Sequence, residues 1–185
     1  MENPQLDAVV ESLISCYRSG GKLLVCGNGG SAADSAHIAG ELVKGFRKKR
    51  PLPDEWKAVL GEAPLQQGLP AVDLTAQSAL MTAVVNDIGG EYIFAQQVLA
   101  YGVPGDMLIG ISTSGNARDV YLAVLAAKAK GVTTVGFTGQ GGGKLREVCD
   151  LMVEAPEKET FRVQEEHIKL YHELCARVED AFFDE

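Results

Sequence analysis

The sequence predicts an α/β fold, in which a mainly parallel sheet is flanked by helices on both faces. Short apolar runs alternate along the chain with longer segments of helical periodicity, and glycines or prolines separate most of them. Neighbouring parallel strands need a long crossover connection, usually a helix, so the alternation favours a parallel sheet over hairpins. The length agrees, because 185 residues, 46% of them hydrophobic, suit one domain with a sizeable core.

The first elements are a helix over residues 3–19 and a short apolar strand over 22–26. Apolar residues recur at helical spacing in the first segment, and Gly20-Gly21 ends it. The strand runs into a tight glycine turn over 27–30, which allows a ligand to approach the backbone closely.

A second helix follows the glycine turn. We expect Ser31 to be its N-cap, with Asp34 as a weaker capping partner, and the helix to run to about Lys44. The prolines beyond it indicate a long irregular loop over 45–70, with room for one short helix near 54–60.

From residue 71 the alternation of strand and helix continues to the end of the chain. Apolar runs define the strands, and glycine-rich or capping segments bound them. The expected strands are 71–74, 107–111, 132–138 and 151–154. The expected helices are one from about 75 that ends at the Asn86-Asp87-Ile-Gly-Gly90 break, then 91–101, 117–130, 144–148 and 160–183.

The composition excludes several classes of protein. A net charge of −8 argues against a duplex-DNA partner, which usually demands a basic surface. The apolar runs fall short of the roughly 20 residues of a membrane helix, and the first residues do not resemble a secretory signal. We therefore expect a cytoplasmic protein. The four cysteines form no C-x-x-C pair, and the basic run over 47–50 is either a solvated loop or a contact for an anion or partner.

Two loops follow buried strands and are the candidate ligand sites, because parallel sheets bind ligands at the carboxyl ends of their strands. The loop over 112–116 carries three consecutive hydroxyls, Ser112, Thr113 and Ser114, ahead of a helix. Backbone N–H groups, the helix dipole and hydroxyl donors together favour a phosphate there, whereas a plain cap would need only one serine. The glycine loop over 27–31 is less specific and matches no standard dinucleotide or Walker pattern.

Two helices carry residue types suited to acid–base or metal chemistry. His37 and Glu41 are four residues apart and so share a helix face. On the last helix, Gln164 and His172 are about 12 Å apart along a straight axis, a long reach for one metal ion. His167 lies roughly 140° around that helix from His172, so both cannot easily face one site, and we favour His172.

These motifs together resemble the phosphoheptose isomerases of the sugar-isomerase (SIS) superfamily, over about residues 8–183. The segments that carry the resemblance are Cys26-Gly-Asn-Gly-Gly-Ser31, His37 with Glu41, Asn86-Asp87, Gly110-Ile-Ser-Thr-Ser-Gly-Asn116, Gly136-Phe-Thr-Gly139 and Gln164-Glu-Glu-His167 with His172. The resemblance implies a single flavodoxin-like SIS domain over 1–185, assembled as a homotetramer with active sites at subunit interfaces.

The resemblance also implies a reaction and roles for the matched residues. The reaction is conversion of D-sedoheptulose 7-phosphate to D-glycero-D-manno-heptose 7-phosphate through an enediol, on the route to heptose for surface polysaccharide. Glu41 and His172 would be the acid–base pair. Substrate would contact Asn28, Gly29, Gly30, Ser31, Glu41, Asn86, Asp87, Ser112, Thr113, Ser114 and Gln164. One zinc ion per subunit would be held by His37, Glu41, Gln164 and His172.

Three departures from the family pattern stand out. Ala117 occupies a position where many relatives have a serine that adds a phosphate hydroxyl, the loop over 51–70 is longer than the common form, and the N-terminal helix is shorter. Rival interpretations are a non-catalytic SIS protein that binds phosphosugars or regulates replication, and an isomerase for another ketose phosphate. Glu41 and His172 favour the enzyme over the non-catalytic relatives.

Overall fold

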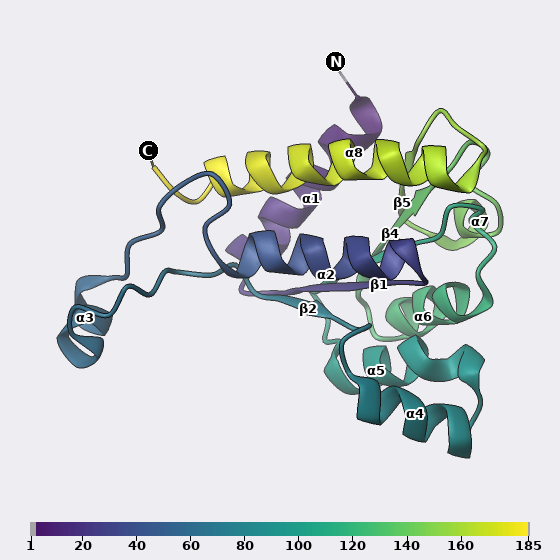
Figure 1. Ribbon diagram of the computed structural model, residues 1–185, viewed down its shortest axis with the longest axis horizontal. Coiled ribbons are helices and arrows are strands. Elements are labelled where there is room, and N and C mark those ends of the chain that lie inside the picture. Colours follow the sequence, from purple (N-terminus) through teal and green to yellow (C-terminus); the bar gives the residue numbers. More distant parts are fainter. Residues whose placement is uncertain (1–2, 185) are drawn as a thin grey trace.

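Residues 3–184 are described by the computed structural model and contain one five-stranded parallel sheet in the order β2-β1-β3-β4-β5 (Figure 1). Its strands are β1 (Leu23–Gly27), β2 (Ala71–Asp73), β3 (Met107–Ile111), β4 (Thr133–Thr138) and β5 (Leu151–Glu154). Gly27 pairs with Ile111 at the ends of β1 and β3. The strand order reverses at this pair, so the two candidate loops flank the topological switch point where such sheets bind ligands. The predicted fold class is confirmed.

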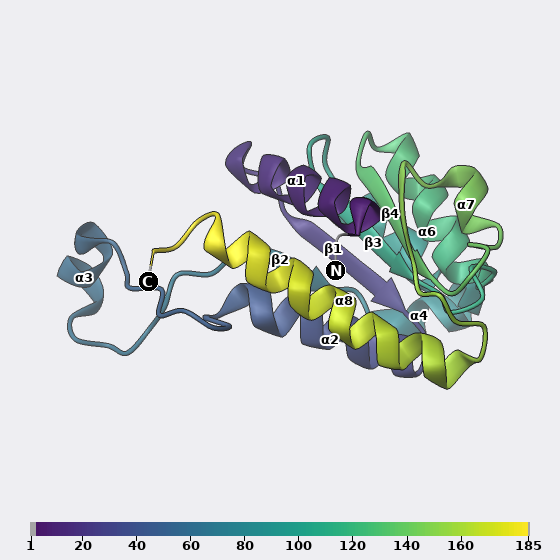
Figure 2. The ribbon, with the colours of Figure 1, turned by 90° about the horizontal axis from the view of Figure 1, so that it is seen from above.

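Helices form a layer on each face of the sheet (Figure 2). They are α1 (Pro4–Arg18), α2 (Gly30–Val43), α3 (Asp54–Leu60), α4 (Ser78–Asp87), α5 (Ile93–Tyr101), α6 (Arg118–Ala129), α7 (Leu145–Val148) and α8 (Thr160–Asp180), with a 3-10 turn η1 (Gly90–Tyr92). α1, α2 and α8 contribute to the core on one face, and α4, α5, α6 and α7 to the core on the other.

Successive residues of a strand contribute alternately to the two hydrophobic cores, one on each face of the sheet. Leu23 and Val25 of β1 belong to the core shared with α1 and α8, whereas Leu24 and Cys26 belong to the core shared with α5 and α6. This follows from the two-residue period of a strand, whose successive side chains point to opposite faces. The continuous apolar run of β1 is therefore explained by burial on both faces.

The start of α2 corrects the prediction for Ser31. The helix begins at Gly30, and Gly29 occupies the N-cap position without a side-chain hydrogen bond. Gly29 has φ +56°, a conformation that glycine adopts far more readily than serine does. Ser31 is instead buried in the first turn, and Asp34 accepts a hydrogen bond from Tyr171 rather than capping the helix.

Other helix limits differ by a few residues. α4 begins at Ser78 rather than near Thr75, because the Asp73 carboxylate accepts hydrogen bonds from the Thr75 amide and hydroxyl and holds that segment in a turn. α8 ends at Asp180, three residues before the expected limit. The short helix expected near 54–60 is α3.

An arm, defined here as residues 45–68, leaves the body after α2 and returns to β2. It carries α3 and projects away from the sheet and its helices (Figures 1 and 2). Its base is fixed by bonds from the Gln67 amide to the Arg50 carbonyl (2.8 Å) and from the Gly45 amide to Gln66 Oε1 (2.8 Å). None of the described helices combines the length and apolar character needed to cross a bilayer.

Candidate functional site

The serine loop lies between β3 and α6 and is ordered by its own hydroxyls. Ser112 Oγ accepts a hydrogen bond from the Ala117 amide (3.3 Å), and Ser114 Oγ accepts one from the Asn116 amide (3.2 Å). A serine hydroxyl that accepts such a bond still has its proton to donate. Thr113 is half-buried and Ser114 exposed, so these hydroxyls, with the first N–H groups of α6, suit an anion.

Gly115 forces this loop into its shape. Its φ is +67°, and a Cβ there would collide with the Gly142 carbonyl. The Leu145 amide donates to the Gly115 carbonyl (3.1 Å), which fastens the loop to α7. The serine loop therefore packs against the glycine-rich segment that follows β4.

The glycine turn after β1 is hydrogen-bonded to α6, the helix that follows the serine loop. Asn28 is exposed, and its Nδ2 donates to Asp119 Oδ1 in the first turn of α6 (2.9 Å). Gly30 lies under the Gln164 side chain, because a Cβ on Gly30 would overlap the Gln164 amide. The structure thus gathers Asn28, Gly29, Gly30 and Gln164 beside the switch point.

Farther along the same two helices, the predicted acid–base residues meet. His37 Nε2 lies 3.1 Å from Glu41 Oε1, so the shared helix face is confirmed. His172 Nε2 lies 3.5 Å from His37 Nε2, and the two imidazole rings pack edge to face. α2 and α8 run side by side in the same direction, which places Gln164 at Gly30 and His172 about two turns later at His37 (Figure 1).

His167 faces away from this cluster. It is fully buried, its Nε2–H donates to the Thr138 carbonyl (3.1 Å), and its ring packs on Phe137. Burial lowers the pKa of His167 and favours its neutral form. The preference for His172 over His167 therefore agrees with the structure.

Sequence reasoning missed two polar residues behind His37. The Tyr171 hydroxyl lies 2.9 Å from His37 Nδ1 and 3.3 Å from Asp34 Oδ1. Burial raises the pKa of Asp34, and burial with the nearby Asp34 charge raises the pKa of Tyr171. Asp34 is three residues before His37, so helical spacing places it on the same side of α2. Tyr171 is adjacent to His172 and points in another direction on α8, so spacing gave no signal for its contact with Asp34.

The positions of the protons shared by Asp34, Tyr171 and His37 determine whether His37 could bind a metal ion. If Tyr171 donates to Asp34, then His37 donates its Nδ1–H to Tyr171, and the neutral ring presents the Nε2 lone pair to Glu41 and His172. A histidine oriented by a hydrogen bond at its other nitrogen is typical of metal sites. If Tyr171 donates to His37 instead, Nε2–H is free to donate to Glu41.

The donor atoms fit zinc only in part. Ligands at about 2.0–2.1 Å in a tetrahedral site are about 3.3 Å apart, close to the 3.1 and 3.5 Å found around His37 Nε2. Yet no group of three or more His, Cys, Asp and Glu side chains in residues 3–184 is arranged to hold a metal ion as it stands. Gln164 packs on Gly30, about two helical turns from His37.

Asn86 and Asp87 lie at the end of α4, and both are exposed. Asn86 Nδ2 donates to Asp87 Oδ1 (2.7 Å). Within residues 3–184 neither side chain is bonded to the His37 cluster or to the serine loop. One chain therefore brings together the two loops and the His37 cluster along α2 and α8, but does not close the site around them.

The strand order 2-1-3-4-5, the hydroxyl-rich loop at the switch point and the His37 cluster on the neighbouring helices define an α/β protein with a candidate site for an anionic ligand. A family model described as the SIS domain matches residues 1–139. A phosphoheptose isomerase of Roseiflexus sp. is 46% identical over 182 residues, which cover 98% of this chain and 84% of that protein. The chain belongs to the phosphoheptose isomerase family of SIS-domain proteins.

Solved structures agree with this assignment. A phosphoheptose isomerase from Neisseria gonorrhoeae superposes with a TM-score of 0.81 at 35% identity, and one from Francisella tularensis with 0.83 at 32%. Each alignment covers 96% of this chain and 86% of the other.

Proposed function

We propose that this protein is a cytoplasmic isomerase that converts D-sedoheptulose 7-phosphate to D-glycero-D-manno-heptose 7-phosphate, in heptose biosynthesis for surface polysaccharide. The observation that carries the proposal is that His37 Nε2 lies close to both Glu41 Oε1 (3.1 Å) and His172 Nε2 (3.5 Å). A phosphate loop alone would suit a sensor or a regulator as well as an enzyme. A carboxylate and an imidazole on α2 and α8 would supply the base and the acid that an aldose–ketose isomerisation needs.

The reaction moves one carbon-bound proton between adjacent carbons. The Glu41 carboxylate removes the proton from C1 of the ketose and returns it to C2 of the enediol. His172 moves the proton between the oxygens on C1 and C2, which converts the C2 ketone into the C1 aldehyde. The serine loop binds the phosphate at the far end of the sugar, and Asn28, Ser31, Asn86 and Asp87 would contact its hydroxyls.

A zinc ion would be held by His37, Glu41 and His172, with Gln164 as a fourth ligand, and would polarise the substrate carbonyl. The two donor distances support this proposal, and His37 Nε2 would offer a lone pair to the metal in the arrangement in which Tyr171 donates to Asp34. The position of Gln164 on Gly30 does not, because Gln164 would have to move or come from another subunit.

We also propose that the active site is completed at a subunit interface of a homotetramer. The separation of Asn86 and Asp87 from the His37 cluster supports this, as does the separation of Gln164 from that cluster. A second chain could then supply the groups that one chain leaves apart.

The test is direct conversion of substrate. The protein is incubated with sedoheptulose 7-phosphate, with and without a chelator, and the sugar signals are followed by NMR. Appearance of the aldose supports the isomerase, and loss of activity with the chelator, restored by zinc, supports the metal. Absence of conversion in every condition would overturn the proposed reaction and favour a binding protein.

A further inference from the structure

The arm carries an apolar stripe that its own chain does not cover. Trp56, Val59 and Leu60 occupy positions i, i+3 and i+4 of α3 and so lie on one face. They are 50%, 85% and 46% exposed, and no residue of α3 is buried. Such a stripe normally packs on a core, so here it points to a partner outside the chain.

The helix itself also needs that partner. α3 has seven residues, about 10 Å of helix, and isolated helices of this length are not stable in water. The arm is fastened to the body at its base, where the Phe46, Arg47 and Lys48 amides and the Arg50 guanidinium all bond Glu179 of α8. Packing of the stripe against another surface would supply the tertiary contact that stabilises most short helices.

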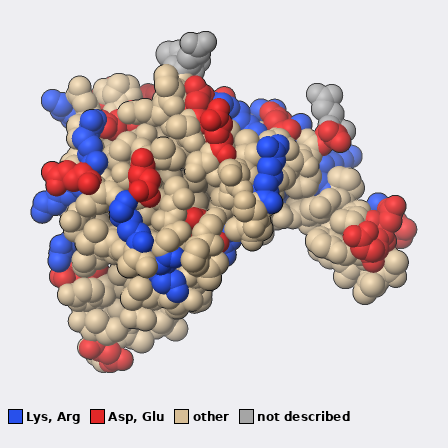
Figure 3. All heavy atoms as spheres, turned by 180° about the vertical axis from the view of Figure 1, so that it is seen from behind, with Lys and Arg blue, Asp and Glu red and all other residues tan. Residues whose placement is uncertain are grey.

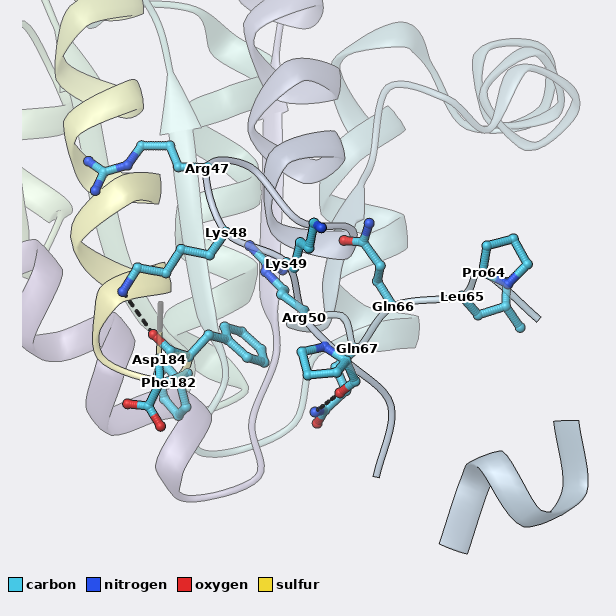
Figure 4. A pocket seen from close by; sticks show the side chains of 12 residues that line it. Arg47, Lys48, Lys49, Arg50, Pro64, Leu65, Gln66, Gln67, Phe182 and Asp184 are labelled. Carbon is cyan, nitrogen blue, oxygen red and sulfur yellow. Dashed lines mark hydrogen bonds between the residues drawn. The ribbon is translucent and has the colours of Figure 1, made fainter. Parts of the chain in front are cut away.

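A matching surface lies at the base of the arm. A pocket of about 930 Å³ opens between the arm base and the C-terminal segment (Figure 4). Pro51, Leu65 and Phe182 give it apolar walls, and the basic run over 47–50 lines it as well. No residue of α3 lines this pocket, so α3 does not fill the pocket of its own chain.

The charges of the two surfaces are complementary. The arm around α3 carries Asp54, Glu55 and Glu62, whose exposed carboxylates are partly balanced by Lys57 (Figure 3). The pocket is lined by four basic residues, of which Arg47, Lys48 and Arg50 are paired with Asp180 or Glu179, and by one acidic residue, Asp184. Lys49 is exposed and has no carboxylate partner within residues 3–184, so it is the cation available to a partner. An acidic, apolar tip therefore fits a basic, apolar pocket.

We propose that the occupant of the pocket is the arm of a second copy of this chain. Two arms that lie antiparallel around a two-fold axis place the tip of each beside the base of the other, so both stripes and both pockets are covered at once. The contact uses none of the candidate site residues, so it does not depend on the proposed reaction. The basic run and the inserted loop, which the reaction leaves without a role, both take part in it.

Site-specific cross-linking between differently tagged copies tests the arrangement. One copy carries Lys49→Cys and the other Val59→Cys, and the mixture is treated with a short bis-maleimide. We expect a cross-linked species that contains both tags. The matched control pairs Lys49→Cys with Ala129→Cys, an exposed position on α6. Wild-type protein gives the background, since Cys16, Cys26 and Cys175 are buried and Cys149 is half-buried.

A second variant tests whether the cross-link depends on the apolar stripe of α3. Trp56→Ser with Leu60→Ser, placed in the Val59→Cys copy, should abolish the mixed species and lower the mass measured by sedimentation. The variant should keep a near-ultraviolet circular dichroism spectrum typical of a folded body, because α3 does not pack on the body. A Lys49–Val59 yield no higher than the Lys49–Ala129 control would overturn the proposal. Persistence of the cross-link in the stripe variant would overturn it too.

Discussion

His172 Nε2 lies 3.5 Å from His37 Nε2, although 135 residues separate the two histidines in the sequence. The approach depends on α2 and α8 running side by side in the same direction. Arg50 fixes one end of this helix pair, because its guanidinium bonds Glu179 on α8 and the carbonyls of Glu41 and Leu42 on α2. The acid–base residues are thus placed by helix packing.

Glu41→Gln and His172→Gln should each lower kcat about 10²- to 10⁴-fold, the range for loss of one general acid or base. Glu173→Gln, an exposed neighbour of His172, is the matched control and should retain wild-type turnover. The measurement is the rate of aldose formation by NMR at saturating substrate. Near-normal turnover in Glu41→Gln would remove Glu41 from the mechanism.

Helical and strand periodicity were enough to predict the α/β class, most elements and the two strand-end loops. They were also enough for the His37–Glu41 face and for choosing His172 over His167. Ser31 was misplaced because a serine after glycines looks like an N-cap, whereas Gly29 alone reaches the positive φ of that position. Asp34 and Tyr171 were missed because their contact depends on the register of α2 against α8, which no local pattern encodes.

Tyr171→Phe should weaken the site without removing a proposed catalytic group. The variant leaves His37 Nδ1 and the buried Asp34 without their hydroxyl partner, and an unsatisfied buried polar group costs about 1–3 kcal/mol. We expect the free energy of unfolding in urea to fall by that amount and kcat to fall several-fold. Tyr121→Phe on α6 is the control. A variant with unchanged stability and turnover would show that the Asp34–Tyr171–His37 chain has no positioning role.

Arg50→Met should destabilise the protein by about 3–5 kcal/mol. Arg50 and Glu179 are both fully buried, and the substitution leaves the Glu179 carboxylate buried without its partner. Arg47→Met, which removes an exposed pairing with Asp180, should change the free energy of unfolding by less than about 1 kcal/mol. Urea unfolding of the two variants measures the difference. Equal effects would mean that the buried pair does not fasten α2 to α8.

Glu179 should also make stability depend on acid pH. Its burial raises the pKa, but hydrogen bonds from the Arg47 and Phe46 amides and from Arg50 outweigh burial and hold the pKa below its usual range. A lowered carboxyl pKa stabilises the fold above the ordinary glutamate value of about 4.3, and this stabilisation is lost as the pH falls through the folded value. Wild-type stability should therefore fall more steeply below about pH 4.3 than that of Glu179→Gln. Parallel curves would contradict this assignment.

Ala117→Ser should strengthen phosphate binding. Ala117 is the N-cap residue of α6 and follows the serine loop directly, so we expect a hydroxyl at this position to reach the proposed phosphate site. One added hydrogen bond is worth about 0.5–1.5 kcal/mol, or about a two- to tenfold lower KM for the sugar phosphate. Ala129→Ser at the other end of α6 should leave KM unchanged. Initial rates over a range of substrate concentrations give KM for both variants, and a KM that stays the same in both would place the phosphate away from residue 117.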